Sequence, residues 1–467
     1  MKHKNNKILL VEPDFPFPTK SKNKADQVHK NFVPIGLLKL GALHKDKGNK
    51  VKLIRGNKTK EEIRKNGSDR WYVPHKILVT SLFTYWSDYV WGCINHYRKL
   101  FPNSGICVGG IYATLHSDTK KFKKQAEKFK VTVFNGINHE AEEYLPDYSL
   151  LPEVDYHATH MMRGCKRGCK FCGVWKLEPE PSTKTKNDII DELKKISKNR
   201  VIFYDNNILD NPHIKEILNA LGELRINGRP IWFESQSGFD GRILEKNPVL
   251  AELIKKARFH NIRIAWDNSV EDKDSIKKQI DFLVKAGYPA KDISVFMIYN
   301  FDISYNDMIK KLNYCKKWGV QISDCRYRPI DLDYDNYNPN MRNGQPDNSF
   351  YIHKKAGWTD KKIRDFRKKV RQHNIWIRYA KDKGLEYDPK MEKWSAIHNT
   401  YKFFNLGRPP PMEMIEKSLT QQRRIKRLNR LKNYCKKNNI HAPNFNELKN
   451  REVDRKLDKF EKKFKIN

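Results

Sequence analysis

Short apolar runs alternate with amphipathic segments along roughly the first 330 residues of this 467-residue chain. The strand candidates in the first 150 residues are Lys7–Glu12, Val51–Ile54, Lys76–Phe83, Gly105–Gly109 and Lys130–Phe134. Pro34–His44 and Tyr89–Phe101 have apolar residues at helical spacing. Parallel strands need crossover connections, usually helices, so the alternation predicts an α/β fold. Residues 1–150 are expected to form a doubly wound, Rossmann-like domain.

Ligands of doubly wound sheets bind beyond the carboxyl ends of the strands. Gly109 and Gly110 lie in a segment, 109–115, that the sequence predicts as such a loop. Two glycines let a backbone approach a ligand closely, and a cofactor contact is therefore expected there. A structural turn is the competing interpretation. The pair lacks the full G-x-G-x-x-G pattern, so a dinucleotide site is not supported.

Three of the eight cysteines lie close together in the segment RGCKRGCKFCG. Cys165, Cys169 and Cys172 have the spacing C-x3-C-x2-C. In a cytosolic chain such a group is better interpreted as a set of metal ligands than as a disulfide framework. A four-iron cluster is normally held by four cysteines. Three cysteines would leave one iron open to bind another molecule, as in catalytic zinc sites with an open position.

The residues between the cysteines favour this interpretation. Glycines that free the backbone are Gly164, Gly168 and Gly173, and cations that offset thiolate charge are Lys166, Arg167 and Lys170. Phe171 is an aromatic ring beside the last cysteine, able to pack on a planar ligand. The competing interpretation is a zinc site completed by a histidine, either His157 or His160.

The motif C-x3-C-x2-C with an aromatic residue before the last cysteine resembles the radical SAM superfamily. The resemblance implies a 4Fe-4S cluster on Cys165, Cys169 and Cys172, with S-adenosylmethionine bound to the fourth iron. It also implies an enzyme that cleaves S-adenosylmethionine reductively to a 5′-deoxyadenosyl radical. The protein's contribution is then to position the radical and exclude competing reactions.

A second series of strand and helix candidates covers residues 151–330. The strand candidates are His157–Met162, Arg200–Tyr204, Pro230–Phe233, Ile262–Trp266, Ile293–Ile298 and Val320–Ser323. The series resembles the six-stranded partial β/α barrel of radical SAM enzymes. Barrel enzymes place their sites at the carboxyl ends of the strands, and polar residues follow the strands here. The last strand ends near Arg326 and Arg328.

By this resemblance, several of these polar residues are expected to bind S-adenosylmethionine. Asp205, Asn206 and Asn207 stand where the family binds the amino group, although the common Gly-Gly-Glu is absent. Carboxylate and amide oxygens can accept hydrogen bonds from an ammonium group. The other expected cofactor-binding residues are Phe171, Glu234, Ser235, Gln236 and Asp267. A helix cap or a satisfied turn is the competing interpretation of each polar residue.

A parallel α/β domain ahead of such a barrel resembles the cobalamin-binding group of the superfamily. The segments that carry the resemblance are KILLVEP, PIGLLKLGALHKDKG, VGGIYATL and NGINHEAEEYLPDYSLLP. Cobalamin-dependent methyl transfer is one implied reaction, and a rearrangement or ring-forming oxidation is another. No Asp-x-His-x-x-Gly motif occurs, so a lower axial histidine ligand to cobalt is not supported. A relic domain without cofactor remains the alternative.

The third region, residues 331–467, is expected to be a basic helical extension. The chain carries 92 Lys and Arg against 55 Asp and Glu, a net charge of +37. Residues 151–350 contribute +4, whereas residues 351–467 contribute +20. Lys361–Lys381 and Met414–Lys437 are the helix candidates. The basic faces of the second helix could follow nucleic acid phosphates, or they could be ordinary solvated faces.

The charge suggests two further hypotheses about function. One is a radical SAM enzyme that modifies tRNA. The methylthiotransferase subtype is disfavoured, because only Cys93 and Cys107 precede the triad and that subtype carries a second cluster. The other, ranked lowest, is a non-catalytic metal-containing protein that binds nucleic acid.

The sequence also gives expectations about the cellular location and the partners of the protein. No run of about 18 uncharged apolar residues occurs, so neither a membrane span nor a membrane partner is expected. A cytoplasmic location is expected, with a reductant such as flavodoxin or ferredoxin as partner. The sequence identifies neither the substrate nor the residues that act on it.

Overall fold

The structure of this protein is a computed structural model. It describes residues 5–16, 32–65, 73–337, 350–382, 387, 427–441 and 450–464. Contacts divide the chain into two units, Met1–Asn374 and Ile375–Asn467. The boundaries expected from the sequence, near residues 150 and 330, stay predictions.

The N-terminal part contains a five-stranded parallel sheet in the order β2-β1-β3-β4-β5. Its strands are β1 (Lys7–Glu12), β2 (Lys50–Arg55), β3 (Lys76–Ser81), β4 (Gly105–Gly110) and β5 (Val131–Val133). The helices are α2 (Ile35–Asp46), α3 (Lys60–Lys65), α4 (Ser87–Leu100), α5 (Ile111–His116), α6 (Lys120–Lys128) and α7 (His139–Glu142), followed by the short η1 (Tyr148–Leu150). The strand order reverses between β1 and β3, which makes this pair the topological switch point.

Apolar side chains point alternately to the two faces of this sheet, and helices therefore cover both faces. Leu9 and Val11 of β1 pack in one cluster with Ile94 of α4. Ile8 and Leu10 point to the opposite face and pack with Leu37 of α2. The predicted doubly wound sheet is therefore confirmed.

The second sheet system forms a partial barrel of parallel strands. Its strands are β6 (His157–Thr159), β9 (Arg200–Phe203), β12 (Trp232–Ser235), β13 (Phe259–His260), β14 (Arg263–Ala265), β15 (Ser294–Tyr299) and β16 (Gln321–Arg326). They pair in the orders β6-β9-β12-β13 and β14-β15-β16. A parallel bridge between Phe239 and Ile264 links the two sets. The predicted partial barrel is confirmed, with β13 and β14 together in the place of one strand.

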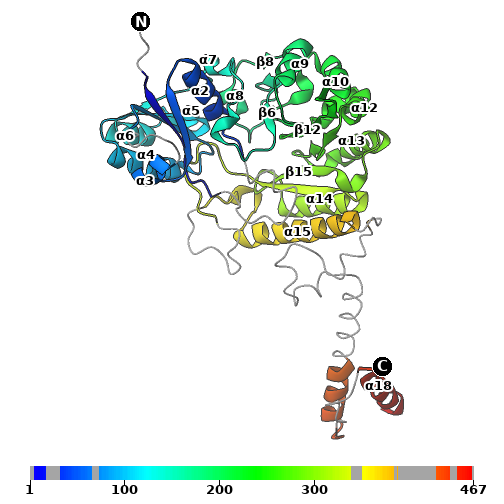
Figure 1. The fold of residues 1–467 in the computed structure, drawn as a ribbon. Coiled ribbons are helices and arrows are strands. Elements are labelled where there is room, and N and C mark those ends of the chain that lie inside the picture. The colour runs from blue at the N-terminus through cyan, green and yellow to red at the C-terminus, as the bar shows by residue number, and fades with distance from the viewer. Residues whose placement is uncertain are drawn as a thin grey trace. The chain divides into compact units, whose positions relative to one another are not determined.

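Helices pack along the outside of this barrel (Figure 1). They are α9 (Lys186–Lys194), α10 (Ile214–Glu223), α11 (Gly241–Lys246), α12 (Val249–Lys256), α13 (Lys273–Lys285) and α14 (Tyr305–Trp318), with the short turns η2 (Ile208–Asp210), η3 (Val270–Asp272) and η4 (Ala290–Asp292). Two small antiparallel hairpins join β7 (Met162–Arg163) to β8 (Ser182–Thr183) and β10 (Arg225–Ile226) to β11 (Arg229–Pro230). One large apolar cluster fills the space between strands and helices, with Phe203, Ile264 and Leu283 fully buried.

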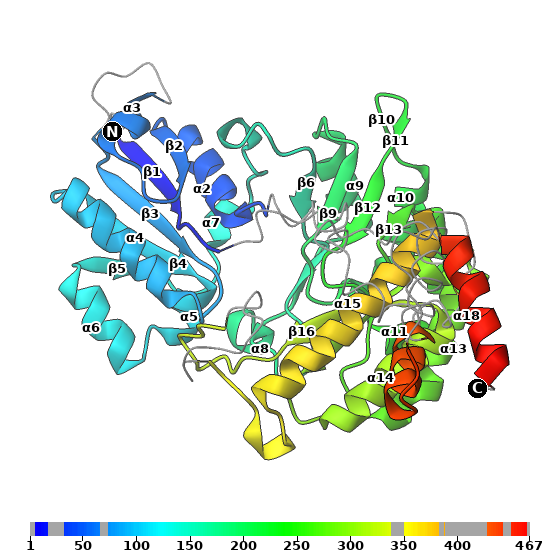
Figure 2. The same ribbon diagram turned by 90° about the horizontal axis from the view of Figure 1, so that it is seen from below.

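The C-terminal region is helical where the structure describes it. Helix α15 (Asp360–Asp382) follows the short turn η5 (Lys354–Ala356), and Figure 2 shows α15 running alongside β16 and α14. Phe366 of α15 packs against Tyr299 of the barrel, with ring centroids 5.1 Å apart. In the second unit, residues 427–437 and α18 (Asn450–Phe464) are helical. The part of the predicted helix Met414–Lys437 that precedes residue 427 lies outside the described residues.

Two local expectations differ from the structure. The segment 109–115 is not a loop, because α5 begins directly after Gly110. The third barrel strand runs through Glu234 and Ser235 rather than ending before them. A charged residue fits inside this strand because Arg263 on the neighbouring β14 donates to the Glu234 carboxylate at 2.6 Å.

None of the helices in the described ranges is both long and apolar enough to span a membrane.

Gly110 offers a test of this fold. Its φ is +101°, and a Cβ atom there would lie 2.3 Å from the Ser81 carbonyl oxygen of β3. Gly110→Ala should lower the free energy of unfolding by about 2 kcal/mol or more. Gly36→Ala is the matched control, since nothing lies within 4 Å of its Cβ position. Urea unfolding of both variants measures the difference, and equal stabilities would contradict the packing described.

Candidate functional site

The three cysteines lie on the loop between β7 and α8 (Val174–Leu177), at the carboxyl end of the first barrel strand. All three are half-buried, with free thiols. Gly164 begins the loop with a φ of +76°, and a Cβ there would lie 3.0 Å from the Pro181 Cα. A turn closes the other end, where the Cys172 N–H donates to the Cys169 carbonyl at 3.0 Å. The loop therefore needs glycine at its first position and reverses direction at its last two cysteines.

Glu178 anchors the start of this loop. Its Oε2 accepts from the Gly164 N–H at 2.7 Å and from Asn206 Nδ2 at 2.8 Å. Its Oε1 accepts from Arg163 Nη1 at 2.6 Å. One carboxylate thus ties the cysteine loop to the residues that follow β9.

A chain of charges continues from this anchor into the Rossmann-like domain. Arg163 Nη2 donates to Glu142 Oε1 of α7 at 2.8 Å, and Lys39 Nζ of α2 donates to Glu142 Oε2 at 2.9 Å. Burial alone would raise the pKa of Glu142, but Arg163 and Lys39 outweigh it and hold the pKa below its usual value. The carboxylate is therefore ionised at neutral pH and joins the two sheets electrostatically.

The thiols lie near one another in partly buried surroundings. Burial raises the pKa of Cys169 and of Cys172, and the other cysteines and Asp267 add to the effect. Arg242 opposes it at Cys169. The Arg167 N–H donates to Cys165 Sγ at 3.4 Å. A bound metal cluster would supply the positive charge that such closely spaced thiolates need.

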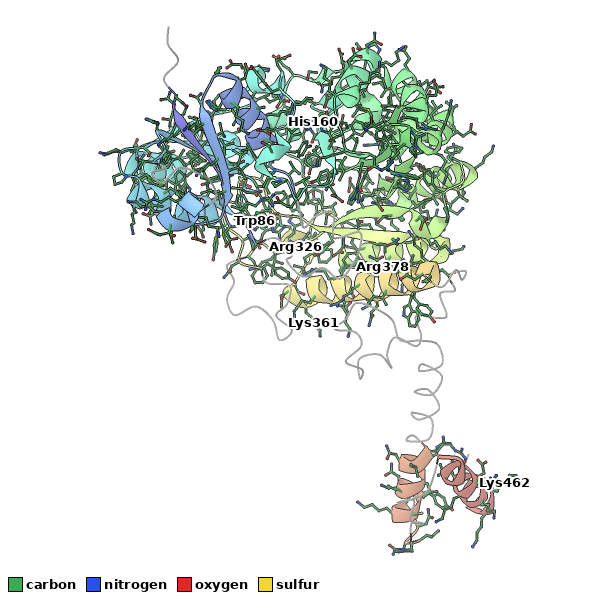
Figure 3. All side chains as sticks on the ribbon, viewed as in Figure 1. Trp86, His160, Arg326, Lys361, Arg378 and Lys462 are labelled. Carbon is green, nitrogen blue, oxygen red and sulfur yellow. The ribbon has the colours of Figure 1, made fainter. Side chains whose placement is uncertain are left out.

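Three half-buried thiols on one loop fit the ligand set of a four-iron cluster. Among the described residues, no three His, Cys, Asp or Glu side chains converge as ligands of one metal ion. The three ligands of a four-iron cluster bind three different irons and need not converge on one point. His157, a candidate for completing a zinc site, is paired with Glu192 at 3.0 Å. Burial holds the pKa of the other candidate, His160 (labelled in Figure 3), well below its usual value.

Asp205 is fully buried and faces the backbone that leads into the cysteine loop. Its Oδ1 accepts from the Met161 N–H at 2.9 Å and from the Met162 N–H at 2.6 Å. Burial raises the pKa of its carboxyl to about 7, although these donors oppose the shift. The observed contacts of Asp205 make it a support of this backbone, and its expected contact with S-adenosylmethionine stays a prediction.

Asn207 is buried and has an unused acceptor. Its Nδ2 donates to Asp240 Oδ2 at 3.4 Å, whereas its Oδ1 has no hydrogen-bond partner within the part of the chain that the structure describes. Asp240 also accepts from Arg167 Nε of the cysteine loop and from Arg242 Nε, each at 2.9 Å. Sequence reasoning missed Asp240 and Arg242. The available signal was weak, because Asp240 is the N-cap of α11 and resembles any other cap.

The three residues expected to follow the third barrel strand have different hydrogen-bond partners. Glu234 pairs with Arg263 and also accepts from Asn261 Nδ2 at 2.8 Å. Ser235 Oγ donates to the Gly238 carbonyl at 2.8 Å. The Gln236 backbone N–H donates to the Phe203 carbonyl at 2.9 Å. The side chain of Gln236 is half-buried. The side chains of Glu234 and Ser235 thus have partners within the barrel.

Asp267 follows β14 and lies in the electrostatic surroundings of the cysteines. Burial raises the pKa of its carboxyl to about 6, with Lys311 and Arg242 opposing the shift. Lys311 is itself buried and donates to the Asn268 carbonyl at 3.0 Å. This lysine therefore holds the turn that carries Asp267.

Aromatic rings continue from the cysteine loop to the far side of the barrel. The ring of Phe171 contacts that of Phe301, with centroids 5.6 Å apart. Phe301 in turn contacts Tyr327 at 4.6 Å. These rings form an apolar wall beside the last cysteine.

The Rossmann-like domain reaches the site at α5. A Cβ on Gly173 would lie 3.5 Å from Leu115 of α5 and 3.7 Å from Ile330. Gly109 and Gly110 precede α5, and the Gly109 carbonyl accepts from Ser81 Oγ at 2.8 Å. The observed role of this glycine pair is close packing of β4 on β3, and its expected cofactor contact stays a prediction.

A partial β/α barrel with three cysteines after its first strand has the organisation of a radical SAM domain. Residues 159–317 match the family model described as the Radical SAM superfamily. The chain therefore carries a radical SAM domain, and the prediction from the sequence is confirmed for this part of it.

Several solved structures are similar to this chain at low identity. The cobalamin-dependent S-adenosylmethionine radical enzyme OxsB has 16% identity and a TM-score of 0.43, over 66% of this chain and 51% of that one. SuiB from Streptococcus suis, bound to its precursor peptide SuiA, has 14% identity and a TM-score of 0.31, over 48% and 56%. Methylornithine synthase has 10% identity and a TM-score of 0.29, over 46% and 61%. The chain thus spans between half and two thirds of each protein.

No curated protein matches this chain significantly.

The anchor at Glu178 can be tested directly. Glu178→Ala removes the acceptor of Arg163, Gly164 and Asn206. We expect the free energy of unfolding to fall by about 2 kcal/mol, because the Gly164 N–H and the Asn206 amide lose their partner. The control is Glu180→Ala, two residues away and exposed. Guanidinium unfolding compares the two, and a loss no larger than that of the control would show that the anchor is dispensable.

Asp205 predicts a pH dependence of stability. Its pKa of about 7 lies above the usual value of 3.8, so the folded chain holds a proton that the unfolded chain releases between these values. This group's contribution therefore makes the free energy of unfolding fall as pH rises from about 4 to about 7. Asp205→Asn should flatten that slope, although it also lowers stability at every pH. Unfolding at pH 5 and pH 7.5 measures the slopes, and identical slopes would contradict the assignment.

Proposed function

We propose that Cys165, Cys169 and Cys172 hold a 4Fe-4S cluster and that this protein uses it to cleave S-adenosylmethionine. When bound and reduced, the cluster supplies one electron that breaks the sulfonium C5′–S bond, giving methionine and a 5′-deoxyadenosyl radical. The observation that carries the proposal is the position of the three cysteines on one anchored loop at the carboxyl end of the first barrel strand. Barrel enzymes work at this end of their strands.

The polar residues around the loop suggest how the chain would bind S-adenosylmethionine. Asn207 would accept a hydrogen bond from an ammonium group through its Oδ1, which has no partner among the described residues, and Asp240 orients its amide. Asp267 contributes a second carboxylate near the cysteines. Phe171 and Phe301 offer apolar faces to a planar group. Glu234, Ser235 and Gln236 are proposed to support the ribose side of the site from β12.

An acidic electron carrier is the proposed reductant. Lys166 and Arg167 on the cysteine loop are partly exposed, with 69% and 38% of their side chains open to solvent. Positive charge around the loop would attract the acidic surface of a flavodoxin or ferredoxin.

Cobalamin is proposed as a further cofactor of the Rossmann-like domain. The switch point between β1 and β3 is where doubly wound sheets bind flat cofactors. Phe15 follows β1, and Phe83, Tyr85 and Trp86 follow β3. The ring of Phe83 stacks on Tyr85 with centroids 5.1 Å apart, and 38% of Phe83 is exposed. Methyl transfer through cobalamin, or a rearrangement, would follow on a substrate still to be found.

Nucleic acid is the second candidate substrate, and helix α15 favours it. Lys361, Lys368 and Arg371 are exposed on this helix, while Ile363, Phe366 and Val370 on its other side are buried. A row of exposed cations can follow phosphates. A salt-dependent shift of labelled tRNA by the full chain, lost when these three residues become Gln, would support this candidate. Equal binding by the variant would count against it.

The cysteines give the decisive test of the proposed function. After anaerobic reconstitution, the protein should contain about four irons and four sulfides and release 5′-deoxyadenosine from S-adenosylmethionine when reduced. Cys169→Ala should lose both properties, whereas Cys107→Ala in β4 should keep them. Cobalt retained after expression with cobalamin tests the second cofactor. An intact cluster in Cys169→Ala, or no 5′-deoxyadenosine from the reduced protein, would refute the proposal.

A further inference from the structure

Two arginines stand at the carboxyl end of the last barrel strand. Arg326 is the final residue of β16, and Arg328 follows two residues later. Their guanidinium groups lie against the same carboxylate, Asp335. Among the described residues, Asp335 is the one carboxylate within ion-pair distance of either arginine.

This carboxylate does not balance both cations. Asp335 Oδ1 accepts from Arg326 Nη2 and from the Tyr337 N–H at 3.1 Å, and Oδ2 accepts from the Tyr351 N–H at 3.2 Å. Arg328 Nε lies 3.7 Å from Oδ1, too far for a hydrogen bond. The Nε atoms of both arginines are buried without a hydrogen-bond partner. Among the residues that the structure describes, two cations share one carboxylate, so one positive charge is left without a counterion there.

Arg328 is held in place without using its donors. Its guanidinium lies over the ring of Tyr85, 4.0 Å from the centroid, and Tyr85 belongs to the segment after β3 of the Rossmann-like domain. Stacking fixes the plane of the group while leaving its N–H groups available. One quarter of the Arg328 side chain, 25%, is open to solvent, compared with 4% of Arg326. Figure 3 labels Trp86, which follows Tyr85 in the chain, and Arg326, which precedes Arg328 by two residues.

The residues before and after Arg328 both lead to the cysteine loop. Tyr327, between the two arginines, contacts Phe301, which contacts Phe171 beside Cys172. Ile330, two residues after Arg328, lies 3.7 Å from the Cβ position of Gly173. A ligand bound to Arg328 would therefore lie near the group held by the cysteines.

We propose that Arg328, supported by Arg326, binds an oxyanion of the substrate, either a carboxylate or a phosphate. The planar fork of donors matches both groups, and an anion would neutralise the unpaired buried charge. The assignment of this anion to the substrate rests on the proposed function, in which the carboxylate of S-adenosylmethionine binds iron. The anion-binding site itself does not depend on that function.

The test uses acetate and inorganic phosphate as probes. Each is titrated calorimetrically into the reconstituted full chain at constant ionic strength, without S-adenosylmethionine. We expect saturable binding, with the tighter probe showing whether the site prefers a carboxylate or a phosphate. Arg328→Gln should weaken it about tenfold or more, because the charge and the donor fork are lost. Arg328→Lys should weaken it less, since it keeps the charge.

Two further variants keep the test decisive. Arg229→Gln, on an exposed residue of β11, is the control and should bind both probes as the unaltered chain does. Tyr85→Leu removes only the aromatic ring and should weaken binding of the probes less than Arg328→Gln does. Because both arginines remain in this variant, its result does not depend on whether Arg328→Gln folds. No saturable binding by the unaltered chain, or equal binding by Arg328→Gln, would overturn the proposal. Binding of the probes without 5′-deoxyadenosine formation would overturn the proposed function and leave the anion site standing.

Discussion

Arg163 stands between two carboxylates, Glu142 of the Rossmann-like domain and Glu178 beyond the cysteine loop. Two cations, Arg163 and Lys39, balance these two carboxylates, so the group brings no net charge into a region of low dielectric. The Nε, Nη1 and Nη2 atoms of Arg163 each donate to an oxygen of one of the two carboxylates. Because Glu178 also holds the Gly164 N–H, the start of the cysteine loop depends on this same ion pair. The two sheets and the loop are thus joined by one electrostatic chain, which begins at Lys39.

The site is built where the carboxyl ends of two parallel sheets meet. The segment after β16 crosses this region and contacts both sides of it. The His116 ring of α5 is hydrogen-bonded to the Ile330 carbonyl at 2.7 Å, and Lys121 of α6 pairs with Asp333 at 2.7 Å. Arg328 stacks on Tyr85 in the same region. One short segment therefore brings the last barrel strand, the Rossmann-like domain and the cysteine loop together.

Periodicity predicted the strands closely because a buried strand needs several apolar residues in succession. The candidate Lys7–Glu12 coincides with β1, and Ile293–Ile298 differs from β15 by one residue at each end. Helix α5 was not predicted, because the two glycines before it are typical of a loop. In the structure, Gly110 is required because a Cβ atom there would clash with the Ser81 carbonyl. The radical SAM domain was recognisable because three cysteine ligands at fixed spacing are a local pattern.

The residues around the cysteines were harder to predict, because hydrogen-bond partners distant in sequence decide what a polar side chain does. Asp205 and Asn207 are both polar residues after β9, and nothing local separates them. In the structure, Asp205 accepts from two backbone N–H groups, whereas Asn207 keeps an unpartnered oxygen. Asp240 and Arg242 carried no distinctive pattern and became visible only through their contacts with Arg167 and Asn207. The sequence by itself determined the alternating α/β organisation and the cysteine motif, since both depend on near neighbours along the chain. Only the tertiary structure decided which charges are paired and that Arg326 and Arg328 share a single carboxylate among the described residues, because burial and pairing depend on residues brought together by folding.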